Sequence, residues 1–195
     1  MENEEKITKS PRKLWRVSKQ SWIDSARKAL FSGGIDRVKI DLLARKLKVT
    51  RGSFYWHFKN RADLLNTLIE DWKENNTKPM LDAIELSGRN GDKNDFNYFC
   101  DLLMEEKKYL PKFDSAMRDW ARHDKKVAQL VKEVDNTRID ALTKMFTNYG
   151  FEPNEAFIRA RVTYYHQVGY YALNVQETPE EREKWGSYYD KILLE

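Results

Sequence analysis

The amino-acid sequence predicts an all-α fold. Apolar side chains recur at i, i+3, i+4 and i+7 along most of the chain, a spacing that places them on one face of a helix. Glycine, proline and short polar runs separate these stretches, as expected where helices end. A chain of 195 residues can hold a small helical domain and a larger one that share continuous packing. We expect the smaller domain at residues 19–77 and the larger one at residues 78–195.

Residues 1–18 precede the first expected helix. They are rich in charged side chains and contain Pro11 and a basic cluster of Arg12, Lys13 and Arg16. This composition favours a mobile basic arm over a packed element.

Residues 40–59 predict two short helices joined by a tight turn. The apolar stripe of the first helix consists of Ile40, Leu43, Ala44 and Leu47. Because Ala44 is small, a second helix can cross the first one closely. The second helix should begin at Thr50, whose hydroxyl is expected to accept an orphan backbone N–H. Phe54 and Phe58 lie four residues apart and should point inward. The outward positions are Arg51, Gly52, Ser53, Tyr55 and Trp56.

This outward set has the chemistry needed to read DNA. The Arg51 guanidinium matches the O6 and N7 acceptors of guanine in the major groove, and Gly52 lets the backbone approach closely. Ser53 can bond to a base edge, whereas Tyr55 and Lys59 can reach phosphates. We therefore expect a DNA-binding helix-turn-helix. In that setting the N-terminal arm can follow the minor groove, and a plain disordered tail is the equal alternative.

A further helix should begin at Asn60, which can act as its N-cap, with Asp63 in a capping-box-like arrangement. Its apolar stripe is Leu64, Leu65, Leu68, Ile69 and Trp72. Polar residues and proline at 75–79 are expected to end it. The helix would bridge the two domains, so a change in its angle would move the reading helix.

Charge is divided unevenly along the chain. Residues 1–77 carry 17 Lys and Arg against 10 Asp and Glu, a net charge of +7. Residues 78–195 carry 18 against 21, a net charge of −3. One basic lobe on a mildly acidic body is typical of a nucleic-acid-binding protein.

From about Trp22 to Trp72 the sequence resembles the N-terminal domain of TetR-family transcriptional regulators. The resemblance rests on residues 26–34, 40–44 and 49–65, and it is strongest where Tyr55-Trp56-His57-Phe58 is followed by a basic residue. Two positions depart from the family pattern: Lys48 replaces the usual turn glycine, and Lys39 replaces a Ser or Thr cap. The expected DNA-binding residues, with contacts by Tyr55, His57 and Lys59 implied by the resemblance, are Lys39, Lys48, Thr50, Arg51, Gly52, Ser53, Tyr55, Trp56, His57 and Lys59.

The larger domain also reads as all helical. The expected helices are Met80–Glu85, Asp95–Lys108, Phe113–His123, Lys126–Tyr149, Asn154–Val175 and Pro179–Leu194. Residues 154–175 carry two apolar stripes, and a helix that is apolar on two sides must be covered on two sides. The resemblance implies a dimer formed by the last two helices. The expected interface residues are Gly169, Ala172, Trp185, Tyr188 and Tyr189.

The resemblance further implies an effector cavity among the inner helices. Its candidate ligand-binding residues are Phe99, Trp120, Tyr164, Tyr165 and His166. The competing reading is that these aromatic side chains only form the core, which is the commoner role of aromatic residues at helical spacing. An arginine in such a helix, for example Arg161, commonly pairs with an acidic neighbour.

Other features exclude several protein classes. Cys100 is the single cysteine, so an intramolecular disulfide framework is excluded and a cytoplasmic location is expected. An apolar leader and an 18-residue apolar run are both missing, which argues against secretion and membrane insertion. His57, His123 and His166 lie far apart without partners at metal-ligand spacing, and nucleotide-binding and hydrolase motifs are missing. We therefore expect no metal site, no cofactor and no enzyme activity.

Two hypotheses follow. The favoured one is a homodimeric transcriptional repressor that binds a palindromic double-stranded DNA operator and is released from it by a small-molecule effector. The alternative is an effector-independent DNA-binding or scaffolding protein on the same fold.

Overall fold

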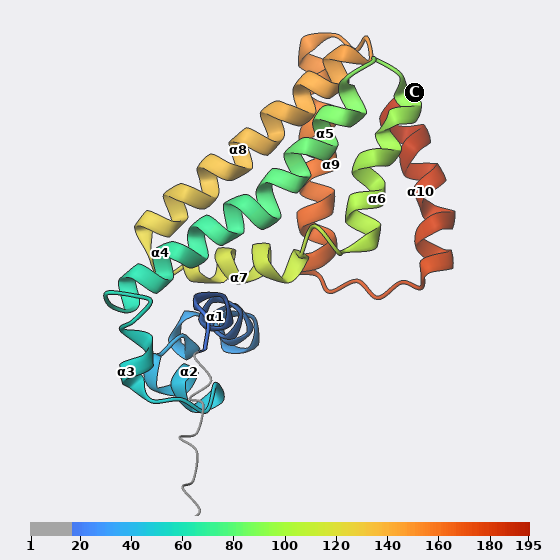
Figure 1. Cartoon of the computed structure of the whole chain (residues 1–195). Helices are drawn as coiled ribbons and strands as arrows, with labels where there is room; N and C mark the ends of the chain where they lie inside the picture. The colour runs from blue at the N-terminus through green and yellow to red at the C-terminus, as the bar shows by residue number, and fades with distance from the viewer. Residues whose placement is uncertain (1–16) are drawn as a thin grey trace, which may run out of the picture.

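The computed structural model describes residues 17–195, and this part of the chain is helical with no β-strand (Figure 1). The all-α prediction is confirmed. The arm expected at residues 1–18 lies, up to residue 16, outside the described residues. The N-terminal elements are α1 (Lys19–Gly33), a 3-10 turn (Ile35–Arg37), α2 (Ile40–Lys46), α3 (Arg51–Phe54) and α4 (Arg61–Trp72). The body contains α5 (Lys78–Gly88), a 3-10 turn (Lys93–Phe96), α6 (Asn97–Glu105), α7 (Pro111–Ala121), α8 (Lys125–Asn148), α9 (Pro153–Ala172) and α10 (Pro179–Leu194).

Side-chain caps set several helix starts. The Asn60 side chain accepts a hydrogen bond from the backbone N–H of Asp63, as the sequence predicts, and Asp63 in turn accepts one from the N–H of Lys59. Asp124 caps α8 in a similar way. Thr178 begins α10 with a full capping box. Each cap satisfies backbone donors that a helix start would otherwise leave unpaired.

The break expected at residues 75–79 is wrong. A π-helical turn (Lys73–Thr77) joins α4 directly to α5, and the backbone stays helical through this junction. Pro79 occupies the first turn of α5, where its missing N–H costs little, and the wider π-helical turn accommodates the proline ring. The two helices therefore form one long rod from the N-terminal domain of α1–α4 into the body (Figure 1).

Two clusters of buried side chains form the core. The first combines α1–α4 with α7 and the first half of α8, and the second combines α5, α6, α9 and the second half of α8. The N-terminal domain therefore shares its core with α7, which lies across the body next to α1 (Figure 1). Arg27 of α1 forms two hydrogen bonds of 2.8 and 2.7 Å to Asp71 of α4. Phe31 packs edge-on against Phe113 of α7, with ring centroids 5.4 Å apart.

Candidate nucleic-acid interface and ligand cavity

The helix-turn-helix is built around stacked aromatic rings. Phe54 and Phe58 are both buried, and their ring centroids lie 5.2 Å apart. Trp22 of α1 meets Phe54 edge-on at 5.3 Å. These contacts fix α3 against α1 and turn the rest of α3 towards the surface, so the inward prediction for both phenylalanines is confirmed.

The remaining positions of the motif face outward. Lys39, Lys48, Thr50, Arg51, Gly52, Tyr55, Trp56 and Lys59 are exposed, and Ser53 is partly buried. Thr50 precedes α3 with extended backbone, but its hydroxyl makes no capping hydrogen bond. The expected cap bond is therefore wrong, because the Ser53 N–H donates to the Thr50 carbonyl oxygen and not to its hydroxyl.

Arg51 is held at the surface by an ion pair with Asp41 of α2, at 2.9 Å. The two side chains are 63% and 60% exposed, so water screens the pair and it contributes about 0–1 kcal/mol. The guanidinium can therefore exchange Asp41 for another acceptor at small cost.

His57 is placed differently from its neighbours. Its Nε2 lies 2.8 Å from the carbonyl oxygen of Val17, at the start of α1, and the residue is partly buried. The ring therefore braces α3 against the N-terminal helix.

The turn between α2 and α3 contains a left-handed lysine. Lys48 has a φ of 58°, a conformation that costs an L-residue about 1–2 kcal/mol and that glycine adopts freely. Lys48→Gly should therefore stabilise the protein by about 0.5–1 kcal/mol in urea unfolding, while the loss of an exposed cation weakens binding to any duplex. Lys46→Gly, at the end of α2, is the matched control for charge. It should weaken duplex binding too but destabilise the fold, and equal stability changes in both variants would contradict the argument.

A buried polar network occupies the centre of the body. Arg138 of α8 is fully buried and donates to the Asp114 carboxylate of α7 at 2.5 and 3.2 Å. The same carboxylate accepts from Trp72 Nε1 at 2.6 Å, Asn76 at 2.9 Å and the Tyr109 hydroxyl at 2.9 Å. Burial alone would raise the pKa of Asp114, but the charge of Arg138 and these hydrogen bonds hold it below its usual range. The network ties the end of α4 to α7 and α8.

The structure does not bring the five candidate ligand-binding residues together. Trp120 is buried in the first core cluster, and Tyr165 lies on the outer face of α9. The Tyr164 hydroxyl bonds to Asp135, which also forms two hydrogen bonds with Arg118. These three side chains have structural partners or face away from the inner helices. Phe99 and His166 do line one cavity.

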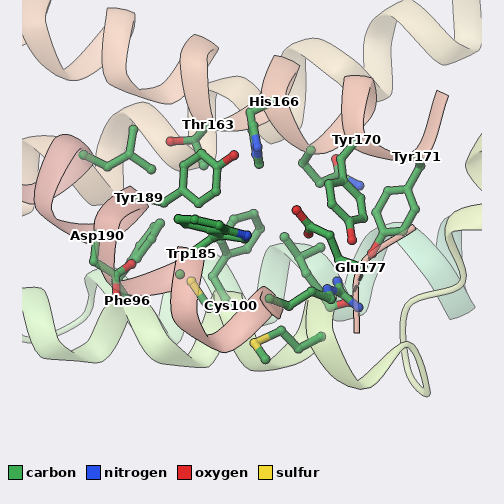
Figure 2. Close-up of a pocket in the computed structure, with 17 residues that line it drawn as sticks. Phe96, Cys100, Thr163, His166, Tyr170, Tyr171, Glu177, Trp185, Tyr189 and Asp190 are labelled. Carbon is green, nitrogen blue, oxygen red and sulfur yellow. Dashed lines mark hydrogen bonds between the residues drawn. The ribbon is translucent and has the colours of Figure 1, made fainter. Parts of the chain in front are cut away.

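That cavity lies between α6, α9 and α10 and has a volume of 140 Å³ (Figure 2). Its walls include Phe96 and Cys100 on the α6 side, Tyr170 of α9, and Trp185 of α10. Burial, with the nearby Asp190 and Asp101 carboxylates, raises the pKa of the Cys100 thiol to about 12, so this thiol stays protonated and unreactive. Burial lowers the pKa of His166, so its ring is neutral at physiological pH.

The expected interface residues divide between this cavity and the surface. Trp185 and Tyr189 line the cavity, and the Tyr189 ring lies 4.4 Å from that of His166. Tyr188 and Ala172 are exposed, and Gly169 has open space where a Cβ would stand. Glu177, between α9 and α10, also lines the cavity and was missed, since one acidic residue in a loop gives no sequence signal.

Among residues 17–195, no cluster of His, Cys, Asp or Glu has the geometry of a metal site. No helix in the same range is long and apolar enough to cross a bilayer.

An exposed α3 on a helix-turn-helix, carried by an all-α body, defines the class of protein. Residues 23–68 match the family model described as "Bacterial regulatory proteins, tetR family". The chain is 36% identical over 52 residues to the HTH-type transcriptional regulator TtgR of Pseudomonas putida, which covers 27% of this chain and 25% of that regulator. It is 40% identical over 53 residues to the tetracycline repressor protein class D of Escherichia coli, covering 27% and 24%. The chain thus spans about a quarter of the length of these curated relatives.

Proposed function

We propose that this protein is a homodimeric transcriptional repressor that binds a palindromic DNA operator through α3 and is released by a small molecule. The observation that carries the proposal is the exposed reading face of the helix-turn-helix. It presents Arg51, Tyr55 and Lys59 to solvent on a rigid aromatic base. The relatives matched by this region are described as transcriptional regulators or repressors.

The reading face has a division of roles. Arg51 would read a base in the major groove after leaving Asp41, and Gly52 would let the backbone approach. Lys39, Lys48 and Lys59 would contact phosphates, with Thr50, Ser53, Tyr55 and Trp56 in reach of the sugar–phosphate backbone or base edges. His57, bonded to the Val17 carbonyl, would position α3.

The outer face of α9 supports a dimer. Ile158, Val162 and Tyr165 are each more than half exposed, and they follow one another at helical spacing towards Gly169. Ile192 of α10 is 71% exposed. Exposed apolar side chains in a continuous stripe mark a protein–protein interface rather than a solvated face. A second copy of the same face would cover them by two-fold symmetry.

The rod formed by α4 and α5 supports coupling between the domains. Its junction carries Trp72 and Asn76, and both bond to Asp114 in the body. A ligand that favours another arrangement of the body would therefore change the angle of α4. The shift is limited to the difference in the ligand's affinity for the two arrangements, typically about 1–3 kcal/mol, or about 5- to 150-fold in operator affinity.

The test is selection of bound duplexes from a random pool, followed by affinity measurements on the recovered site. Arg51→Ala should cost about 1–3 kcal/mol on that site and relax one base position. Lys59→Ala should weaken binding to every duplex by about the same factor. It should also reduce the slope of log affinity against log salt concentration by about one.

Asp24→Ala on α1, where the side chain is 46% exposed, is the control for surface changes. It should alter neither the base preferences nor the salt dependence of duplex binding. Unchanged base preferences in Arg51→Ala would remove Arg51 as the base reader. A failure to recover any preferred site would overturn the proposed function.

A further inference from the structure

The cavity between α6, α9 and α10 has a definite size and wall chemistry. Its volume of 140 Å³ is close to that of a cavity that holds one benzene ring, about 150 Å³. Rings of Phe96, Tyr170, Trp185 and Tyr189 contribute to its walls (Figure 2). The faces of aromatic rings attract cations, Trp most strongly. The walls therefore suit an apolar group joined to a positive charge.

Two acidic side chains line the cavity. Glu177 and Asp190 both line it, and within residues 17–195 neither forms an ion pair. Arg182 is the one Lys or Arg among the described lining residues, but it pairs with Glu106 at 3.6 Å and stacks over the Tyr170 ring at 5.3 Å. Asp190 lies on the far side of Trp185 from Glu177 (Figure 2), so Glu177 is the acidic group at the Tyr170 end of the cavity.

A buried acceptor adds a second, independent sign of a ligand. Gln167 is 4% exposed and lies between this cavity and a second one beside Tyr109 and Arg118, and its Oε1 has no hydrogen-bond partner. Its Nε2 donates to the Tyr109 hydroxyl at 2.5 Å, and that hydroxyl donates to Asp114, so the orientation of the amide is fixed. A buried acceptor left without a donor costs about 1–3 kcal/mol. An N–H of a ligand would satisfy it.

We propose that this cavity binds an organic cation composed of one aromatic-sized apolar group and a protonated amine. The apolar group would lie among Phe96, Trp185 and Tyr189, and the ammonium would face Glu177 at the Tyr170 end of the cavity and donate to Gln167. The inference rests on the proposed function, in which this cation is the effector. Gln167 also connects the cavity, through Tyr109 and Asp114, to Trp72 at the end of α4.

Three probes that share one skeleton test the charge requirement: 4-phenylbutylamine, 4-phenylbutan-1-ol and 4-phenylbutyrate. Binding is measured by calorimetry on the full chain at neutral pH, without DNA. The amine should bind about tenfold more tightly than the alcohol, and the carboxylate should bind most weakly. The proposal is overturned if the alcohol or the carboxylate binds as tightly as the amine or more tightly. It is also overturned if none of the three probes binds detectably up to millimolar concentration.

Variants locate the binding site. Glu177→Gln should weaken binding of the amine about tenfold and leave the affinity for the alcohol unchanged. Glu183→Gln, an exposed α10 residue outside the cavity lining, is the matched control and should change neither. Equal losses in both variants would place the amine elsewhere and overturn the assignment.

Selection of bound duplexes, carried out on the same protein, distinguishes a failure of this proposal from a failure of the proposed function. If the protein recovers a preferred duplex but binds no amine, the cation inference fails and the repressor proposal stands. If the amine binds and Glu177→Gln weakens it while no duplex is recovered, the cavity assignment stands and the repressor proposal fails.

Discussion

Replacing Arg138 with methionine should destabilise the protein by about 3–5 kcal/mol, because it leaves the Asp114 carboxylate buried without its counter-charge. Arg138 is fully buried and Asp114 is 5% exposed, so water cannot replace the lost contact. Methionine fills much of the volume, which limits any cavity contribution. The free energy of unfolding is measured by urea titration, followed through tryptophan fluorescence.

Arg89→Met is the matched control. Arg89 pairs with Glu85 at 3.7 Å on the surface, with the two side chains 59% and 74% exposed. The loss of such a pair changes stability by less than about 1 kcal/mol. Similar losses in both variants would show that the buried pair contributes no more than a surface one.

The same pair gives a pH dependence with a definite sign. Since the pKa of Asp114 is lowered in the folded protein, its stabilisation is complete above the unfolded value of about 3.9 and is lost as the pH falls towards the folded pKa. Without Arg138, burial would instead raise that pKa, so acid would favour folding of the variant. The stability difference between wild type and Arg138→Met should therefore narrow as the pH falls through about 4. A stability difference that does not change with pH would show that Asp114 is not the group whose buried charge Arg138 compensates.

The reading motif could be predicted because its determinants are local. Phe54 and Phe58 are four residues apart, and the Asn60 cap acts within one turn, so spacing alone indicates which side faces inward. The Lys48 conformation also follows from its place in the turn. The missing Thr50 cap bond shows the limit, because sequence spacing does not determine whether the Ser53 N–H donates to the hydroxyl or to the carbonyl oxygen of Thr50.

The buried network could not be predicted in the same way. Trp72, Tyr109, Asp114 and Arg138 lie on separate segments of the chain, and the sequence around Asp114 and Arg138 suits a solvated helical position equally well. Only the packing of α4, α7 and α8 brings them together. The cavity has the same origin, since the position of α10 decides that Phe99 and His166 line it whereas Tyr165 does not.

The other large effect concerns the outer face of α9. Gly169→Glu should convert a dimer to a monomer and weaken operator binding by at least about a hundredfold, because a dimer binds two half-sites at once. A Cβ at Gly169 has no neighbour within 4 Å, so the protomer has room for the new side chain. Glutamate is also a better helix former than glycine. The charge would therefore act between protomers and not on the fold of one.

Sedimentation gives the oligomeric state, and the melting temperature reports on the fold. Ser187→Glu adds the same charge to an exposed site on α10, five positions from Ile192 and so on another face of that helix, and it should remain dimeric with normal operator affinity. Val162→Glu, two turns before Gly169 on the same exposed stripe of α9, should repeat the loss. If Gly169→Glu and Val162→Glu both stay dimeric and folded, the interface lies elsewhere, and the apolar stripe on α9 needs a different partner.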